Sequence, residues 1–131
     1  MVNVTMSEEL AALRIRIPGC SVVAFADLST GLVLASSTSH KTTQERLDAL
    51  CAAARASLLG PSAHKIAEDF AGNAQNTPRV AIHADAHGIT CFVRPSVPAQ
   101  EALCCVLSPE SPLDRVVEDA QAFLLRIVAE D

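Results

Sequence analysis

The spacing of apolar residues divides the chain into segments with helical and strand-like periods. Leu10 and Leu13 recur at helical spacing after Ser7, whose hydroxyl can cap a helix. Pro18 interrupts this pattern, since proline cannot continue a helix. A first helix is therefore predicted at about 7–16.

Two short apolar runs around a turn follow this helix. Residues 20–27 (CSVVAFAD) are rich in Val, Phe and Ala, and residues 32–36 (LVLAS) are apolar again. The turn between them contains Gly31, which suits the tight connection of a β-hairpin. A hairpin is predicted here, followed by a polar loop over 36–43.

A second helix is predicted between Thr42 or Thr43 and the stop signal at Gly60. Glu45, three residues after Thr42, fits a capping box. The predicted inner side is apolar: Leu47, Leu50, Cys51, Ala54 and Leu58. The opposite side carries four alanines: Ala49, Ala52, Ala53 and Ala56. Such a side allows another helix to approach closely, although helix propensity explains the alanines equally well.

The segment after Pro61 predicts a short additional helix and then a loop. Residues 62–70 could form the helix, with Ile66 and Phe70 on one side. Residues 72–78 (GNAQNTP) are rich in turn formers, so a mobile connection is expected there.

Three strands are predicted in the second half of the chain. Residues 79–85 alternate, so that Val80 and Ile82 face one side of a sheet, and residues 89–94 return after a turn. Residues 102–107 (ALCCVL) are apolar without alternation, which is typical of a central strand covered on both faces.

A last helix is predicted after Ser111, its expected cap, with Pro112 at the first position. Its predicted core stripe comprises Leu113, Val117, Ala120, Leu124 and Ile127. Arg115 and Asp119 are spaced to form an ion pair on its surface.

The predicted order of elements is α-β-β-α-β-β-β-α, within one domain that spans residues 1–131. Hairpin connections favour an antiparallel sheet with helices on its faces, and hence an α+β fold. The length suits a single core, and neither a repeat nor a linker interrupts the pattern.

Composition narrows the possible functions of the protein and its possible cellular compartment. The net charge is −5 and Trp and Tyr are absent, so basic patches and stacking platforms for nucleic acid are lacking. Five cysteines without a CxxC pair suit a reducing cytoplasm. No signal peptide or membrane-spanning run is seen. Only 19% of residues are charged, which is low for a solvated monomer and favours self-association.

Residues capable of chemistry are present but form no coherent set. His83, Asp85 and His87 have the composition of a metal site, yet a solvated hairpin tip explains them better. The five cysteines are most simply small core residues, and neither His40 nor His64 can be paired with one from sequence. The glycines all lie at predicted element boundaries, and no phosphate-binding motif occurs. We therefore expect no catalytic, metal or cofactor site, and no enzyme.

The order and spacing of several segments resemble the bacterial roadblock/dynein light-chain family. The segments that carry the resemblance are 13–20 (LRIRIPGC), 22–27 (VVAFAD) and 31–36 (GLVLAS), with Gly88 and the apolar runs before Pro95 and from Ala102. Each motif is unspecific alone, and the resemblance covers about residues 7–129. The segment 62–70 departs from the family pattern.

The resemblance implies a five-stranded antiparallel sheet of roadblock or profilin-like type, with one helix on one face and two on the other. It also implies a two-fold homodimer joined through the helix after Thr43 and the strand at 79–85. The implied role is a non-catalytic regulator or scaffold that binds a small Ras-like GTPase. On this basis the predicted dimer interface comprises Ala49, Ala53, Ala56, Val80 and Ile82. The predicted contacts to a partner are Arg46, Asp48 and Arg55.

Two other classes of function stay open at this stage. A ligand sensor of PAS or GAF type would enclose a pocket between the sheet and residues 62–78. A small Cys/His enzyme would bring a histidine against a cysteine or a carboxylate in a cleft.

Overall fold

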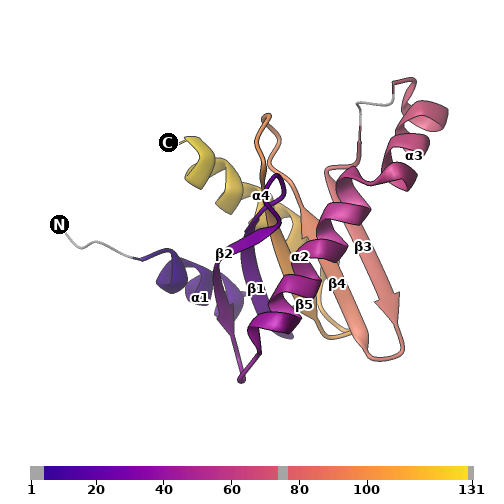
Figure 1. Cartoon of the computed structure of the whole chain (residues 1–131). Helices are drawn as coiled ribbons and strands as arrows, with labels where there is room; N and C mark the ends of the chain where they lie inside the picture. Colours follow the sequence, from indigo (N-terminus) through magenta and orange to yellow (C-terminus); the bar gives the residue numbers. More distant parts are fainter. Residues whose placement is uncertain (1–4, 74–76, 130–131) are drawn as a thin grey trace.

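The computed structural model describes residues 5–73 and 77–129, and these form a five-stranded antiparallel sheet in the order β2-β1-β5-β4-β3 (Figure 1). The strands have the following bounds: β1 Cys20–Asp27, β2 Leu32–Thr38, β3 Val80–Asp85, β4 Gly88–Val93 and β5 Glu101–Leu107. The predicted α+β fold class is confirmed. The expected central strand is β5, which lies between β1 and β4.

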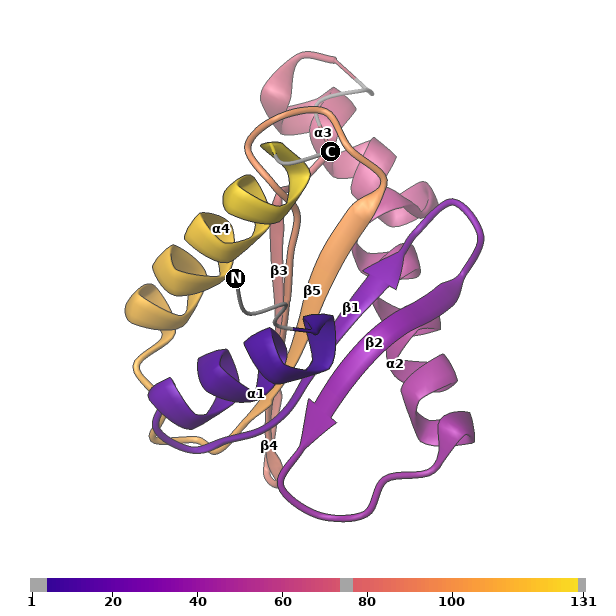
Figure 2. The same ribbon diagram turned by 90° about the vertical axis from the view of Figure 1, so that its left-hand side faces the viewer.

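Helices cover both faces of the sheet. Their bounds are α1 Met6–Arg16, α2 Gln44–Leu59, α3 Pro61–Ala71 and α4 Leu113–Ala129. Figure 2 shows α1 and α4 together on one face, with α2 behind the sheet on the other. This arrangement confirms the predicted distribution of one helix against two. The additional helix α3 follows α2 and extends beyond the sheet on the β3 side (Figure 1).

Threonines cap the first two helices: Thr43 is one of the two predicted starts of α2, whereas Thr5 takes the place of the predicted Ser7 in α1. Thr5, not Ser7, caps α1, since its Oγ1 accepts from the Glu8 N–H at 3.2 Å. Thr43 caps α2 and accepts from the Arg46 N–H at 3.2 Å. The predicted capping box from Thr42 is therefore wrong, because Glu45 is not at the third helical position.

The start of α4 differs for a tertiary reason. Ser111 was expected to cap the helix, but its hydroxyl donates to the Pro18 carbonyl at 2.8 Å. The helix begins at Leu113, and the Pro112 carbonyl accepts its first hydrogen bond. The observed buried stripe is Val116, Ala120, Phe123, Leu124 and Ile127, whereas the predicted Leu113 and Val117 are half-buried. The predicted ion pair between Arg115 and Asp119 is confirmed at 3.8 Å.

β2 is two residues longer than predicted and ends at Thr38. Ser36 and Ser37 pair with Ala24 and Val23 of β1 although their side chains are polar. β2 is an edge strand, where polar side chains can face solvent, so composition alone placed its end too early. Gly31 has φ of 76°, the left-handed conformation that the tight turn requires.

The predicted additional helix at 62–70 is confirmed as α3. Gly60 ends α2 by donating its N–H to the Ala56 carbonyl at 3.0 Å, and Pro61 then occupies the first turn of α3. Ile66 and Phe70 share a side as predicted, and both are exposed. The expected mobile connection includes residues 74–76, which lie outside the described residues.

Candidate interaction surface

α2 lies close to the sheet because both partners present small side chains. Cys51, Ala54 and Leu58 of the helix are buried against a mainly small-residue sheet face, which includes Ala24, Ala26, Ala102 and Cys104. The opposite side of α2 is exposed and carries the predicted alanines: Ala49, Ala52, Ala53 and Ala56. A helix with such an outer side can be approached closely by a second helix.

The predicted strand at 79–85 is an edge of the sheet. β3 pairs with β4 on one side, and no strand of the described residues lies on its other side. Val80 is half-buried, and Ile82 is 44% exposed on the same sheet face as Val80. An uncovered edge with apolar side chains invites pairing with another strand.

A hydrogen bond joins the edge strand to α2. Ser57 Oγ and His83 Nε2 are 2.7 Å apart. The His83 ring also meets the edge of the Phe92 ring, with centroids 5.8 Å apart and planes at 61°. The outer side of α2 therefore borders the open edge of β3, and the two together are called here the α2–β3 surface, defined by Ala49, Ala53, Ala56, Val80 and Ile82. The side chains of Val80 and Ile82 lie on the other sheet face, toward α1 and α4, so β3 contributes to this surface through its backbone edge.

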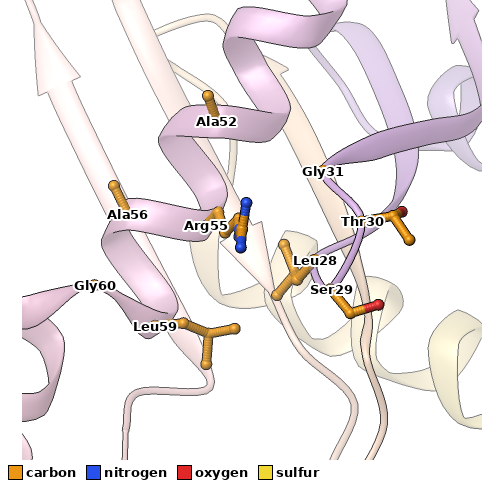
Figure 3. A pocket seen from close by; sticks show the side chains of 9 residues that line it. All are labelled: Leu28, Ser29, Thr30, Gly31, Ala52, Arg55, Ala56, Leu59 and Gly60. Carbon is orange, nitrogen blue, oxygen red and sulfur yellow. The ribbon is translucent and has the colours of Figure 1, made fainter.

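Two hollows flank α2. The larger, about 740 Å³, lies between α2 and the β1–β2 turn and is lined by residues that include Leu28, Arg55 and Leu59 (Figure 3). The smaller, about 390 Å³, lies between the first half of α2 and the sheet, where Thr90 and Val106 form part of its wall. Both hollows adjoin α2, and neither is lined by residues 62–78, where the sensor hypothesis would place a pocket.

The three charged residues predicted to contact a partner do not form one group. Arg55 lines the larger hollow, whereas Arg46 lines the smaller one on the other flank of α2. Asp48, seven residues before Arg55, shares the Arg55 flank by helical geometry and accepts from Gln44 Nε2 at 2.8 Å. One partner molecule on one flank would therefore meet Asp48 and Arg55 but not Arg46.

The His-Asp-His motif has structural roles. Asp85 Oδ1 accepts from the backbone N–H groups of His87 and Gly88 at 2.8 and 3.1 Å, which closes the β3–β4 turn. His83 is engaged with Ser57 on α2. Across residues 5–73 and 77–129, no three potential ligands gather as a metal site would need.

All five cysteines are buried free thiols. Burial raises the pKa of Cys20 and Cys91 to about 11 and that of Cys104 to about 12. Burial also raises the pKa values of Cys51 and Cys105. A nucleophilic cysteine needs the opposite shift, because the thiolate is the reactive form. Cys104 and Cys105 lie on opposite faces of β5, because adjacent residues of a strand point to opposite faces.

Ser57 and the larger hollow were not anticipated from the sequence. A serine on the flank of an amphipathic helix does not by itself predict a contact, because its hydroxyl can be hydrogen-bonded by solvent instead. The spacing of Arg46, Leu50, Ala53 and Ser57 does indicate that they share one flank. The hollow depends on how far the β1–β2 turn stands from α2, which only the folded structure provides.

Comparison with protein-family models and with curated proteins finds no match to this chain. Comparison with solved structures does. A roadblock/LC7 domain from Streptomyces avermitilis has a TM-score of 0.76 at 13% identity, covering 97% of each chain. MglB in a tetrameric arrangement has a TM-score of 0.72 at 18% identity, covering 99% of this chain and 95% of the other.

A gliding protein, MglB from Thermus thermophilus, has a TM-score of 0.67 at 18% identity and covers 100% of this chain and 96% of the other. These similarities define the class of protein by its architecture, and the expected resemblance is confirmed at the level of fold. The chain has the fold of bacterial roadblock/LC7 domains. None of the described helices is long and apolar enough to cross a membrane.

Proposed function

We propose that this chain is a cytoplasmic, non-catalytic module that forms a homodimer through the α2–β3 surface and binds a small Ras-like GTPase. The observation that carries the proposal is the continuity of that surface. The exposed alanine side of α2 is tied to the uncovered edge of β3 by the hydrogen bond between Ser57 and His83. A second copy could cover both elements at once.

The solved structures of similar fold support self-association. One of them is described as MglB with a tetrameric arrangement, and another MglB is described as a gliding protein. Fold likeness at this level of identity does not carry a partner from one chain to another. Self-association is therefore the first property to test, and a regulatory partner is the second.

The state of the side chains supports a non-catalytic role. The raised pKa values of Cys20, Cys91 and Cys104 keep these thiols protonated at neutral pH. His83 faces Ser57, and His40 Nδ1 lies 3.0 Å from the neighbouring Ser39 hydroxyl. Neither arrangement supplies the combination of nucleophile, base and orienting group that a small Cys/His enzyme requires.

The flank of α2 beside the larger hollow is the proposed contact for a GTPase. Arg55 and Asp48 lie on it, and Leu28 and Leu59 give the hollow an apolar part (Figure 3). Partner anchors commonly combine a central apolar contact with charged residues at the rim. Arg46 lies on the other flank, so it would contact the partner only if one GTPase bound across both subunits.

The dimer is tested by static light scattering at micromolar concentration. The expected mass is about twice the 13.8 kDa of one chain. A monomer at all concentrations tested would remove the main support for the proposal, because the α2–β3 surface would then be an ordinary exposed surface.

The partner is tested by calorimetry with Ras-like GTPases encoded in the same genome, each in its GDP and GTP-analogue forms. Binding is expected with at least one of them, and Arg55→Ala should weaken it. Arg16→Ala is the matched control, since Arg16 is an exposed arginine on α1, across the sheet from α2. Absence of binding by every such GTPase would leave a dimer without this partner.

A further inference from the structure

The hydrogen bonds of β3 determine which of its backbone groups face the open edge. The Arg94 N–H donates to the Arg79 carbonyl at 2.7 Å, so this opposed pair is hydrogen-bonded. Because bonded and non-bonded pairs alternate along an antiparallel ladder, Ala81, His83 and Asp85 also direct their backbone groups toward β4. The N–H and C=O groups that face the open edge are those of Val80, Ile82 and Ala84.

The position of α2 limits how a second copy can pair with this edge. If α2 of both subunits meets across a two-fold axis, both helices lie on the same face of the combined sheet, and the axis is perpendicular to that sheet. The two β3 strands are then antiparallel, and directly opposed residues point to the same face. The axis must therefore pass through a residue opposed to its own copy, and the candidates are Ala81, Ile82 and His83.

Only the middle register uses every backbone group at the edge. With the axis at Ile82, Val80 faces Ala84 of the partner subunit, and Ile82 faces its copy. With the axis at Ala81, Ala84 would face Pro78, which has no N–H to donate. With the axis at His83, Val80 would face Ala86, which lies in the turn beyond the strand.

The charges at the two ends of β3 favour the same register. Arg79 lies immediately before the strand, Asp85 is its last residue, and neither forms an ion pair within the described residues. With the axis at Ile82 they become opposed, one pair at each end. Asp85 uses Oδ1 for its turn, which leaves Oδ2, and Arg79 donates Nη1 to the Pro95 carbonyl at 2.7 Å, which leaves its other donors.

Within the described residues, no carboxylate forms an ion pair with Arg79. Arg94, the residue opposed to Arg79 across the ladder, has a buried Nε without a hydrogen-bond partner. Burial, with a contribution from the charge of Arg79, lowers the pKa of Arg94. A carboxylate brought to this end of β3 would offset the repulsion between the two guanidinium groups.

We propose that β3 pairs with β3 of a second copy in the register centred on Ile82, and that Arg79 of each subunit binds Asp85 of the other. The inference rests on the proposed homodimer. It adds the register of the interface and the two residues that select a copy of this same chain as the partner.

Cysteine crosslinking tests the register in the full-length chain. Single variants Val80→Cys, Ile82→Cys and Ala84→Cys place a thiol on the same sheet face at three successive edge positions. A short bifunctional thiol reagent should crosslink the Ile82→Cys variant most, and the other two less and equally. The unchanged chain is the control for background, because its five cysteines are buried.

Each alternative gives a different crosslinking pattern. Equal maxima at positions 80 and 82 would put the axis at Ala81, and equal maxima at 82 and 84 would put it at His83; either result overturns the inference. Absence of crosslinks in a protein that is still dimeric by light scattering overturns the register but leaves the proposed dimer. A monomer overturns both.

Charge exchange tests the ion pairs independently. Arg79→Glu should weaken the dimer on the order of tenfold, the size expected of two exposed pairs. Arg79→Glu combined with Asp85→Lys should dimerise more tightly than Asp85→Lys alone, because the double variant restores opposite charges at both pairs. The two variants can be compared directly, since both carry the same damage to the β3–β4 turn. Arg16→Glu on α1 is the control for charge itself. Failure of the double variant to recover affinity would overturn the pairing of Arg79 with Asp85.

Discussion

The two faces of the sheet are filled by side chains of different size. Under α1 and α4 the core contains large residues such as Leu103, Phe123 and Leu124. Under α2 the contacts come mainly from alanines and cysteines, with Leu28, Leu58 and Phe92 as the larger exceptions. Two helices cover the first face, whereas α2 alone covers the second (Figure 2).

This difference separates the part of the molecule that supports the fold from the part that is available for contacts. Large side chains under two helices bury most of the apolar surface and close that face. Small side chains bring α2 close to the sheet, but one helix is too narrow for five strands. Hollows therefore flank α2, and β3 keeps an open edge.

The largest expected effect is on the closed face. Leu103→Ala should lower the free energy of unfolding by about 2–5 kcal/mol, because Leu103 is fully buried and its loss leaves a cavity. Urea unfolding followed by circular dichroism measures this at fixed protein concentration. Leu34→Ala is the control, since Leu34 on β2 is 53% exposed and should cost much less. If Leu103→Ala and Leu34→Ala lowered the free energy of unfolding equally, the contrast between the closed face and the exposed regions would be wrong.

Alkaline pH should destabilise the protein through its buried thiols. The unfolded thiols titrate near 9.0, whereas folded Cys20, Cys91 and Cys104 titrate near 11, 11 and 12. Above pH 9 the unfolded chain releases protons that the folded chain retains, so stability is complete below pH 9 and falls as pH rises toward 11–12. Chemical unfolding at several pH values should show this decline.

Thiol alkylation extends this prediction to the two faces. Cys51 faces the sheet from α2, which covers its face alone, so it should be the first of the four fully buried thiols to be alkylated as pH rises. Mass spectrometry of peptides from partially labelled protein identifies the order. If a thiol under α1 and α4, such as Cys91 or Cys105, reacted before Cys51, the idea of a thinner cover under α2 would be wrong.

Charged substitutions on the outer side of α2 should affect assembly more than folding. Ala53→Glu or Ala56→Glu should weaken the homodimer at least about tenfold, because each places a carboxylate in the proposed contact between helices. Their cost to the subunit itself should stay within about 0.5 kcal/mol, as for most exposed sites. Sedimentation at graded concentrations measures the dissociation constant.

Ala122→Glu on α4 is the matched control for these variants. Ala122 is likewise an exposed helical alanine, but it lies across the sheet from α2. The control should leave the dissociation constant unchanged. If Ala53→Glu and Ala56→Glu behaved like Ala122→Glu, the interface would have to lie away from the outer side of α2.

The sequence predicted the elements well where a pattern was local. The bounds of β1, the alternating strand β3 and the additional helix α3 followed from apolar runs, alternation and turn residues. One error arose because a distant contact decided the outcome. Ser111 looked like a cap, yet it binds Pro18, which is 93 residues away in the chain.

The candidate site could be predicted in composition but not in geometry. The alanine side of α2 and the alternation of β3 were visible as patterns. Helical spacing alone separates Arg46 from Arg55, but which hollow each of them lines depends on the rotation of α2 over the sheet. The direction of the edge groups of β3 depends on its pairing with β4, which apolar spacing does not specify.

The smallest expected effect concerns the link between α2 and the open edge. Ser57→Ala removes the partner of His83 and should cost about 0.5–1.5 kcal/mol, toward the lower value because the bond is exposed. The loss should be local, since β3 is attached to the sheet on one side only. Hydrogen exchange of the Ala81 and His83 amides, which face β4, should therefore become faster, while amides of β5 keep their protection. Ser62→Ala, at an exposed serine of α3, is the control and should change neither set. If exchange in β3 were unaffected by Ser57→Ala, pairing with β4 alone would hold the strand, and the hydrogen bond to α2 would not contribute to the integrity of the α2–β3 surface.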